Sequence, residues 1–279
     1  MYILDTCAII GISWTKLERA VQKGVDFAVC PTTCFELASH LIRSEEKDYA
    51  RARTNFLKCR MPHLLEDSAV RWADRASATQ GINPGRRDER DLLLQMLDIV
   101  SEAQSLDDLH ARCLRYPDGF MLPLANHGER IDEILRGEEQ WYKDRMKQLL
   151  RESEFFRLPN GSYGITRKIL MGNLERAGGS ESPDSGIGRR RAVNNAMAQA
   201  PYIGYMLHRL YDARNHGRND IDRNDYEDAL ICLAIDLDRN DVLVTEEDGT
   251  IKALTHTAAL LEREACVMSK DEFVQRECQ

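Results

Sequence analysis

The chain alternates short apolar runs with segments in which apolar residues recur every three or four positions. Runs of the first kind predict buried strands, and spacing of the second kind predicts helices. The clearest helix begins at Asp225, and after a polar break at 239–241 the β-branched run 242–245 predicts a strand. The apolar positions that define this helix are Ala229, Leu230, Leu233, Ala234 and Leu237.

The N-terminal part of the chain shows the same alternation. Residues 1–4 and 27–30 predict two strands, each of which leads toward a helix. The first of these helices covers about 13–22. The second begins near Thr32 or Thr33, because either hydroxyl can cap a helix N-terminus. The order strand, helix, strand, helix is typical of α/β proteins.

Weaker patterns extend this alternation on both sides of the middle of the chain. Residues 61–65 predict a third short strand between helical segments at 44–56 and 68–79. Near the C-terminus, residues 265–269 predict a last strand and 270–277 a short helix. The predicted strands therefore come from the two ends of the sequence.

The middle of the chain has a helical pattern instead. We interpret residues 80–200 as a helical insertion between two halves, 1–79 and 201–279, of one α/β domain. Such an insertion costs little chain entropy, because the closure entropy of a loop grows slowly with its length. The predicted helices are one or two over 88–115, and one each over 129–154, 165–176 and 189–214. Segments that contain Gly and Pro predict loops at 80–87, 116–128 and 177–188.

Acidic residues stand at the ends of several predicted elements. Asp5 ends the first strand, and Glu36 lies in the first turns of the helix after the second. Asp225 and Asp228 are one helical turn apart and therefore share a face. Ligands of an open α/β sheet bind beside the carboxyl ends of its strands, so these acids can come together there. Three more acids follow the strand 242–245, namely Glu246, Glu247 and Asp248.

Four pieces of sequence, in this order, resemble the PIN-domain family of metal-dependent ribonucleases. They are YILDTC at 2–7, TCFEL at 33–37, DYEDALI at 225–231 and LVTEED at 243–248. The resemblance implies a three-layer α/β/α fold with a central parallel sheet, to which the insertion adds an α-helical region. It covers the two predicted halves of the domain and stops at the insertion.

The resemblance also implies a set of site residues. Catalytic roles go to Asp5, Glu36, Asp228 and Asp248. The metal ligands it implies are Asp5, Glu36, Asp225, Asp228, Glu247 and Asp248, with Asp5 as the central ligand and Asp225 as a supporting one. The family's fourth acid normally lies two residues after the Thr, which is Glu247 here. Asp248 is slightly favoured over it, because the following Gly249 permits a tight turn.

Two neighbouring positions also enter this comparison. Thr6 and Thr245 are expected to hydrogen-bond the carboxylates. Cys7 stands where the family usually carries Asn. A phosphatase of the haloacid-dehalogenase kind would also begin with an Asp at the end of a first strand. We disfavour that class, because Cys7 occupies the place where its chemistry requires a second Asp.

The implied activity is hydrolysis of RNA phosphodiester bonds, in single-stranded RNA, with Mg²⁺ or Mn²⁺ as cofactor. Hard divalent cations prefer oxygen ligands, and carboxylates also supply negative charge. Two such ions about 4 Å apart can stabilise both the attacking and the leaving oxygen of a phosphodiester. The alternative hypothesis is a catalytically degenerate PIN-like module that binds RNA or a protein without cutting.

Composition narrows the expected partners. A net charge of −8 argues against a protein that coats nucleic acid, but a nuclease can bind its substrate through a local basic patch. Residues 189–191, three consecutive Arg, are one candidate for such contacts, and a solvated helix start is the other reading. Small PIN proteins are often toxins, so a toxin-like role with a regulatory or antitoxin-like partner is one expectation. A homo-oligomer is another.

Two further patterns bear on location and metal class. The chain has no run of about 18 apolar residues, so we expect no membrane span. It opens directly with a predicted strand and has no basic segment before an apolar core, which favours a cytoplasmic protein. Its eight cysteines fit no zinc-binding spacing, so we expect reduced, buried thiols.

Overall fold

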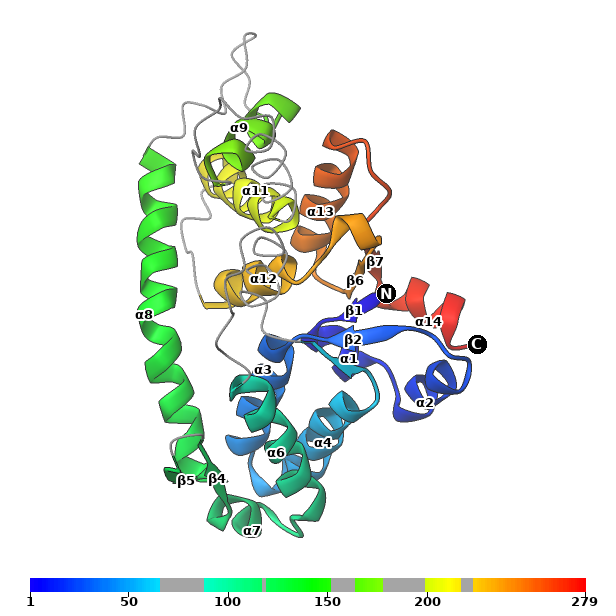
Figure 1. Cartoon of the computed structure of the whole chain (residues 1–279), viewed down its shortest axis with the longest axis vertical. Coiled ribbons are helices and arrows are strands. Elements are labelled where there is room, and N and C mark those ends of the chain that lie inside the picture. Colours follow the sequence, from blue (N-terminus) through cyan, green and yellow to red (C-terminus); the bar gives the residue numbers. More distant parts are fainter. Residues whose placement is uncertain (66–87, 117–118, 152–163, 178–198, 217–222) are drawn as a thin grey trace.

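The computed structural model describes residues 1–65, 88–116, 119–151, 164–177, 199–216 and 223–279. Its centre is a five-stranded, all-parallel sheet with the order β3-β2-β1-β6-β7 (Figure 1). Tyr2 of β1 pairs with Phe27 on one side and with Val242 on the other, so β1 joins the two ends of the chain. The predicted α/β fold with a central parallel sheet is confirmed. The strands are β1 (Tyr2–Leu4), β2 (Phe27–Val29), β3 (His63–Leu64), β6 (Val242–Thr245) and β7 (Val267–Ser269).

Helices from both ends of the chain flank this sheet. The N-terminal ones are α1 (Thr6–Gly11), α2 (Trp14–Gln22), α3 (Pro31–Ile42) and α4 (Glu46–Leu57), followed by the 3-10 helix η1 (Lys58–Arg60). The C-terminal ones are α12 (Arg223–Leu233), the 3-10 helix η3 (Leu237–Arg239), α13 (Asp248–Leu260) and α14 (Lys270–Glu277). The sequence did not predict α1, whose six residues are too few for a periodic signal. Leu237 lies in η3 rather than at the end of α12, because α12 ends at Leu233.

The middle of the chain is largely helical, as expected. It contains α6 (Asp88–Glu102), α7 (Leu106–Ala111), β4 (Cys113–Arg115), β5 (Met121–Pro123), α8 (Leu124–Arg151) and α9 (Arg167–Ala177), and α11 (Ala200–His216) follows at the start of the second half. The one or two helices expected over 88–115 are α6 and α7, although the last residues of that range form β4. The expected loop over 116–128 was wrong, because that range contains β5 and the start of α8. The antiparallel pair β4–β5 has strands of three residues, which are too short to show a period of two.

Several expectations fall on residues whose structure is not described. These are the predicted helix over 68–79, the loop over 80–87, most of the loop over 177–188, and the Arg triplet at 189–191 with the helix start that it was expected to form.

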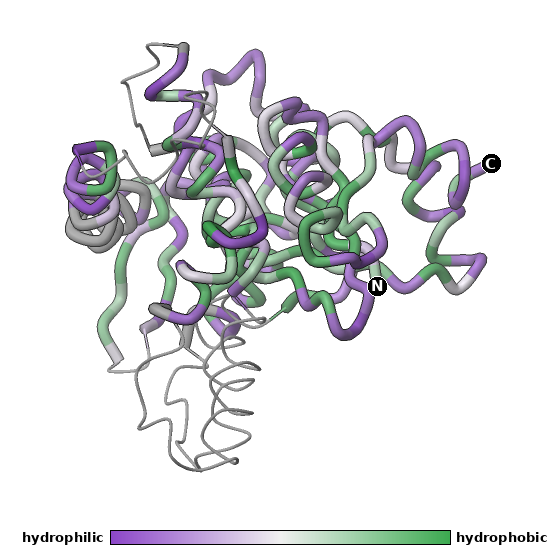
Figure 2. The backbone as a smooth tube through the Cα atoms, turned by 90° about the horizontal axis from the view of Figure 1, so that it is seen from above, coloured by the Kyte–Doolittle hydropathy of each residue, from purple (hydrophilic) through white to green (hydrophobic). Residues whose placement is uncertain are grey.

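Side chains of the sheet divide the core into two buried clusters, because successive residues of a strand point to opposite faces. Ile3 and Leu243 belong to one cluster, together with residues of α8, α9, α11, α12 and α13. Leu4 and Val244 belong to the other, together with residues of α1 to α4, α6, α7 and α14. Helices of the middle region therefore pack on both faces. Figure 2 shows apolar segments at the centre of the molecule and hydrophilic ones around the outside.

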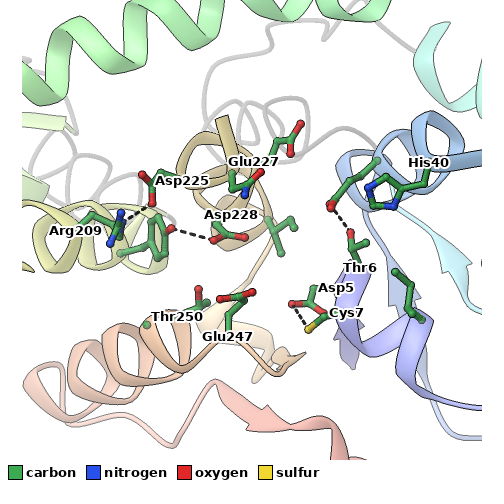
Figure 3. Close-up of a pocket in the computed structure, with 16 residues that line it drawn as sticks. Asp5, Thr6, Cys7, His40, Arg209, Asp225, Glu227, Asp228, Glu247 and Thr250 are labelled. Carbon is green, nitrogen blue, oxygen red and sulfur yellow. Dashed lines mark hydrogen bonds and ion pairs between the residues drawn. The ribbon is translucent and has the colours of Figure 1, made fainter. Parts of the chain in front are cut away.

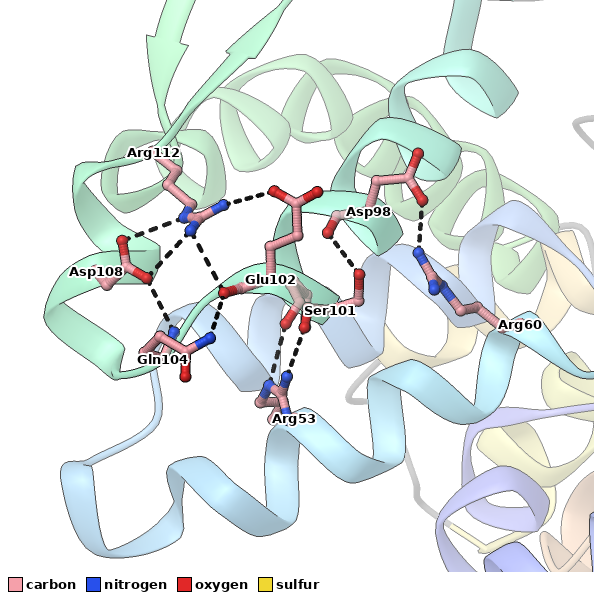
Figure 4. Close-up of polar contacts among 9 residues, drawn as sticks. Arg53, Arg60, Asp98, Ser101, Glu102, Gln104, Asp108 and Arg112 are labelled. Carbon is pink, nitrogen blue, oxygen red and sulfur yellow. Dashed lines mark hydrogen bonds and ion pairs between the residues drawn. The ribbon is translucent and has the colours of Figure 1, made fainter.

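Polar contacts attach α6 to α4 (Figure 4). The Arg53 guanidinium donates to the carbonyl oxygens of Val100 at 3.0 Å and Ser101 at 2.9 Å, which lie in the last turn of α6. Arg60 forms an ion pair with Asp98 at 2.5 Å. A cation at a helix C-terminus satisfies carbonyls that the helix leaves unpaired. These contacts hold the middle region against the N-terminal half of the fold. Among the helices that the structure describes, none has the length and apolar character needed to cross a membrane.

Candidate functional site

A cavity of about 540 Å³ lies beside the carboxyl ends of β1 and β6 (Figure 3). This volume falls within the range of about 300–1,000 Å³ that is usual for ligand pockets. Six acidic side chains line the cavity, together with hydroxyl, thiol, amide, cationic and apolar groups. The acidic lining residues are Asp5, Glu36, Asp225, Glu227, Asp228 and Glu247.

Asp5 is held by its immediate neighbours in the sequence. It follows β1 and serves as the N-cap of α1, where its Oδ1 accepts a hydrogen bond from the Ala8 amide at 2.8 Å. The Cys7 thiol donates to the same oxygen at 3.0 Å. Burial raises the pKa of Asp5, although hydrogen bonds from Thr245, Ala8 and Cys7 oppose this effect. Burial and the Asp5 charge raise the pKa of Cys7 to about 12, so the thiol stays protonated and can donate.

Glu36 approaches the same place from α3. The Thr6 hydroxyl donates to Glu36 Oε2 at 2.5 Å, and this hydrogen bond joins the first turn of α1 to α3. We call Asp5, Thr6, Cys7 and Glu36 the β1 wall of the pocket. His40, four residues after Glu36 and therefore on the same side of α3, also lines the cavity.

The opposite side of the pocket is formed by α12 and α11. Asp228 accepts a hydrogen bond from the Tyr205 hydroxyl at 3.1 Å. Asp225 forms an ion pair with Arg209, with 2.5 Å between Nε and Oδ1. We call Tyr205, Arg209, Asp225 and Asp228 the α12 wall.

The two walls line the same pocket, and the charge of Asp5 in one wall raises the pKa of Asp228 in the other. Burial is the main cause that raises the pKa of Asp228 to about 7, and the Tyr205 hydroxyl opposes it. The charges of Glu247, Asp5 and Asp225 contribute to the same rise, each less than burial does. Carboxylates that repel one another in this way form a pocket of negative potential, which a cation would stabilise.

Glu247 and Asp248 lie on different sides of the chain, although they are adjacent in sequence. Glu247 is the N-cap residue of α13 and lines the pocket, and its amide donates to Thr245 Oγ1 at 3.0 Å. Asp248 is the first residue of α13, is exposed, and is not among the lining residues. The preference for Asp248 is therefore corrected in favour of Glu247. The tight-turn argument fails because Gly249 lies in the first turn of a helix.

The structure thus brings Asp5, Glu36, Asp228 and Glu247 to one pocket, with Asp225 in its wall. Sequence reasoning missed Tyr205, Arg209, Glu227 and His40. Glu227 lies between the two predicted acids of α12 in the sequence, and this position could have indicated that it lies near the site. Tyr205 and Arg209 belong to α11, and no local pattern indicates which helix α11 contacts.

The residues present partly fit a divalent cation. Their carboxylate oxygens are the donors that Mg²⁺ and Mn²⁺ prefer. However, in the described part of the chain no three His, Cys, Asp or Glu side chains lie close enough together to hold one ion. Mg²⁺ usually keeps several waters and is bound through one or two carboxylates plus substrate phosphates, so the donor set is compatible with that mode.

Comparison with known proteins gives no further assignment. No protein-family model matches the chain, and neither a curated protein nor a solved structure shows significant similarity to it.

Proposed function

We propose that this protein is a Mg²⁺- or Mn²⁺-dependent endoribonuclease that hydrolyses phosphodiester bonds of single-stranded RNA. The observation that carries the proposal is the meeting of Asp5, Glu36, Asp228 and Glu247 in one pocket. These acids come from positions up to about 240 residues apart, and they meet beside the strand ends of a parallel sheet, where α/β proteins bind ligands. The same acids carry the resemblance to the PIN-domain family.

Repulsion among these acids supports a role that involves a cation. Carboxylates without a partner would repel one another and the phosphate of a substrate, and the raised pKa of Asp228, to about 7, reflects that repulsion together with burial. When bound, a divalent ion would lower the pKa of a water molecule and stabilise the charge on the leaving oxygen. One or two of Asp5, Asp228 and Glu247 would hold it, together with water and a substrate phosphate.

The chain's own residues have separate tasks in this proposal. The Ala8 amide and the Cys7 thiol orient Asp5. The Thr6 hydroxyl orients Glu36, which stands at the β1 side of the pocket. His40, exposed at the same side, provides a hydrogen-bond donor for a phosphate oxygen of the substrate. The cavity holds roughly one nucleotide, so the rest of the RNA would lie outside it.

A second candidate is a module that binds RNA or a protein without cutting. The observation that favours it is the lack, among the described residues, of three metal ligands that already lie close together. The two candidates differ in one measurable property, namely cleavage that depends on a divalent ion.

The test is an assay of end-labelled single-stranded RNA with Mn²⁺, with EDTA, and with the variants Asp5→Asn and Asp228→Asn. We expect cleavage by the natural chain with Mn²⁺, none with EDTA, and a loss of about 100-fold or more in each variant, as for groups that hold a catalytic metal. Asp248→Asn is the matched control, because it removes a neighbouring acid that does not line the pocket. It should cut at nearly the natural rate.

Three outcomes would count against the proposal. Full activity in EDTA would show that cleavage needs no divalent ion. Full activity of both site variants would show that cleavage does not take place in this pocket. RNA binding by the natural chain without cleavage supports the second candidate instead.

A further inference from the structure

Two side chains of α11 each contact one carboxylate of α12 (Figure 3). Tyr205 and Arg209 are four residues apart and share one face of α11, while Asp225 and Asp228 are three apart and share one face of α12. The contacts are Tyr205 to Asp228 at 3.1 Å and Arg209 to Asp225 at 2.5 Å. One helix face therefore fixes both acids of the other.

The same contacts leave the two acids in different states. Asp225 is 7% exposed, and its charge is neutralised by Arg209. Asp228 receives a neutral hydroxyl, from Tyr205, at its Oδ2, and it lines the same pocket as Asp5 and Glu247. Among the contacts described for Asp228, none engages Oδ1, so this oxygen is available to a cation.

A close approach also joins α11 to α13, the helix at whose N-terminus Glu247 stands. A Cβ atom at Gly204, next to Tyr205, would come within 2.0 Å of Thr257 Oγ1 on α13. The backbone of α11 is thus pressed against α13, and the N-cap of α13 is Glu247. Because α11 contacts both helices, it sets where Asp228 and Glu247 stand relative to one another.

We propose that Tyr205 and Arg209 are positioning residues, which hold the carboxylates of Asp228 and Asp225 so that Asp228 faces the pocket it shares with Asp5 and Glu247, where a divalent cation would be bound through one or two of these carboxylates. Asp225 then supports the site through Arg209 and is not a metal ligand. This inference rests on the proposed function, which it extends to a helix that contains none of the four pieces of sequence that carry the resemblance to the PIN-domain family.

The experiment measures Mn²⁺ binding without RNA, from the loss of the electron paramagnetic resonance signal of free Mn²⁺. Tyr205→Phe removes one hydroxyl and keeps the ring. We expect the Mn²⁺ dissociation constant to rise about tenfold, as for the loss of a hydrogen bond to a charged group. The melting temperature should change little, and kcat for RNA cleavage should fall while KM stays constant.

Tyr202→Phe is the matched control, because Tyr202 lies one turn earlier on α11 and does not line the pocket. It should leave Mn²⁺ binding and kcat unchanged. Arg209→Gln removes the partner of a buried carboxylate and can destabilise the fold, so the double variant Arg209→Gln/Asp225→Asn removes both charges together. In the double variant, Mn²⁺ binding should persist with a weakened dissociation constant.

The possible results separate the two proposals. If the natural chain binds Mn²⁺ and cuts RNA, and Tyr205→Phe binds Mn²⁺ equally well, the positioning role is overturned and the proposed function is not. Complete loss of Mn²⁺ binding in a folded double variant makes Asp225 a ligand and likewise overturns this inference. If the natural chain neither binds Mn²⁺ nor cuts RNA, the proposed function is overturned, and the role of α11 with it.

Discussion

The two walls of the pocket present similar acids but are held in different ways. In the β1 wall, Asp5 is oriented by residues two and three positions further along the chain, through the Cys7 thiol and the Ala8 amide. In the α12 wall, Asp228 is oriented by Tyr205, 23 positions away on another helix. The contacts of Asp5 with Cys7 and Ala8 form whenever the strand and the start of α1 form, and a further hydrogen bond comes from Thr245 of the neighbouring strand β6. The arrangement in the α12 wall requires α11 and α12 to be packed.

This difference predicts where each wall is vulnerable. The β1 wall depends on a helix cap, so single changes there should alter one hydrogen bond each. The α12 wall depends on the distance between helices, so changes that move α11 should disturb several acids together. Variants of α11 should therefore have the largest effects on stability, and variants of the β1 wall the smallest.

The largest effect is expected from Gly204→Ala. The added methyl group would lie 2.0 Å from Thr257 Oγ1 and 2.7 Å from its Cγ2, so α11 and α13 must separate. We expect a loss of about 3 kcal/mol in the free energy of unfolding, measured by urea denaturation.

Two further variants identify the cause of that loss. Gly172→Ala on α9 is the control, because nothing lies within 4 Å of its added Cβ. It should be neutral or stabilise by up to about 1 kcal/mol, since Ala favours helix more than Gly does. Adding Thr257→Ala to Gly204→Ala should restore part of the stability. An equal loss in Gly204→Ala with and without Thr257 would contradict the close approach of α11 and α13.

A slightly smaller effect is expected from acid. The His208 ring of α11 hydrogen-bonds His256 of α13 at 3.0 Å, and burial, with a smaller contribution from His256, lowers the pKa of His208 to about 4. The unfolded chain takes up this proton near pH 6.5, so it binds more protons than the folded chain between those values. Stability contributed by neutral His208 is complete above pH 6.5 and is lost as pH falls toward 4. The loss amounts to at most about 3 kcal/mol.

This window is measured by urea denaturation at a series of pH values. Between pH 6.5 and 4, the stability of the natural chain relative to His208→Gln should fall, because only the natural chain carries this titrating ring. The raised pKa of Asp228 acts in the opposite direction in both proteins and cancels in the difference. His63→Gln should leave the pH dependence of the natural chain unchanged, because His63 is exposed at the edge strand β3. A stability difference between the natural chain and His208→Gln that stays constant across this window would show that α11 and α13 do not bury His208.

The contrast between the walls also explains what the sequence could predict. Asp5 and Glu247 were found because they end strands, and Asp225 and Asp228 because they are one helical turn apart on a periodic helix. Those signals are local. The choice of Asp248 over Glu247 failed because the sequence did not show that α13 begins at Asp248, which turns that side chain outward.

The parts of the fold that could not be predicted depend on contacts between distant elements or on very short ones. Tyr205 and Arg209 gave no signal, since only packing decides that α11 faces α12. The strands β4 and β5 have three residues each and form through pairing with one another. The five-stranded sheet was predictable in outline, because its apolar runs alternate with helices and stand at both ends of the chain.

The smallest effect is expected in the β1 wall, from Thr6→Val. Valine has the same shape but cannot donate to Glu36, whose hydrogen bond from Thr6 measures 2.5 Å. Because Glu36 is only half-buried and water can replace the donor, we expect a loss of about 1 kcal/mol in the free energy of unfolding. Thr54→Val on α4 is the control, since its hydroxyl bonds a carbonyl on an exposed helix surface. A loss in Thr6→Val as large as that in Gly204→Ala would mean that the β1 wall, too, depends on packing between helices, and that the two walls do not differ in the way their contacts indicate.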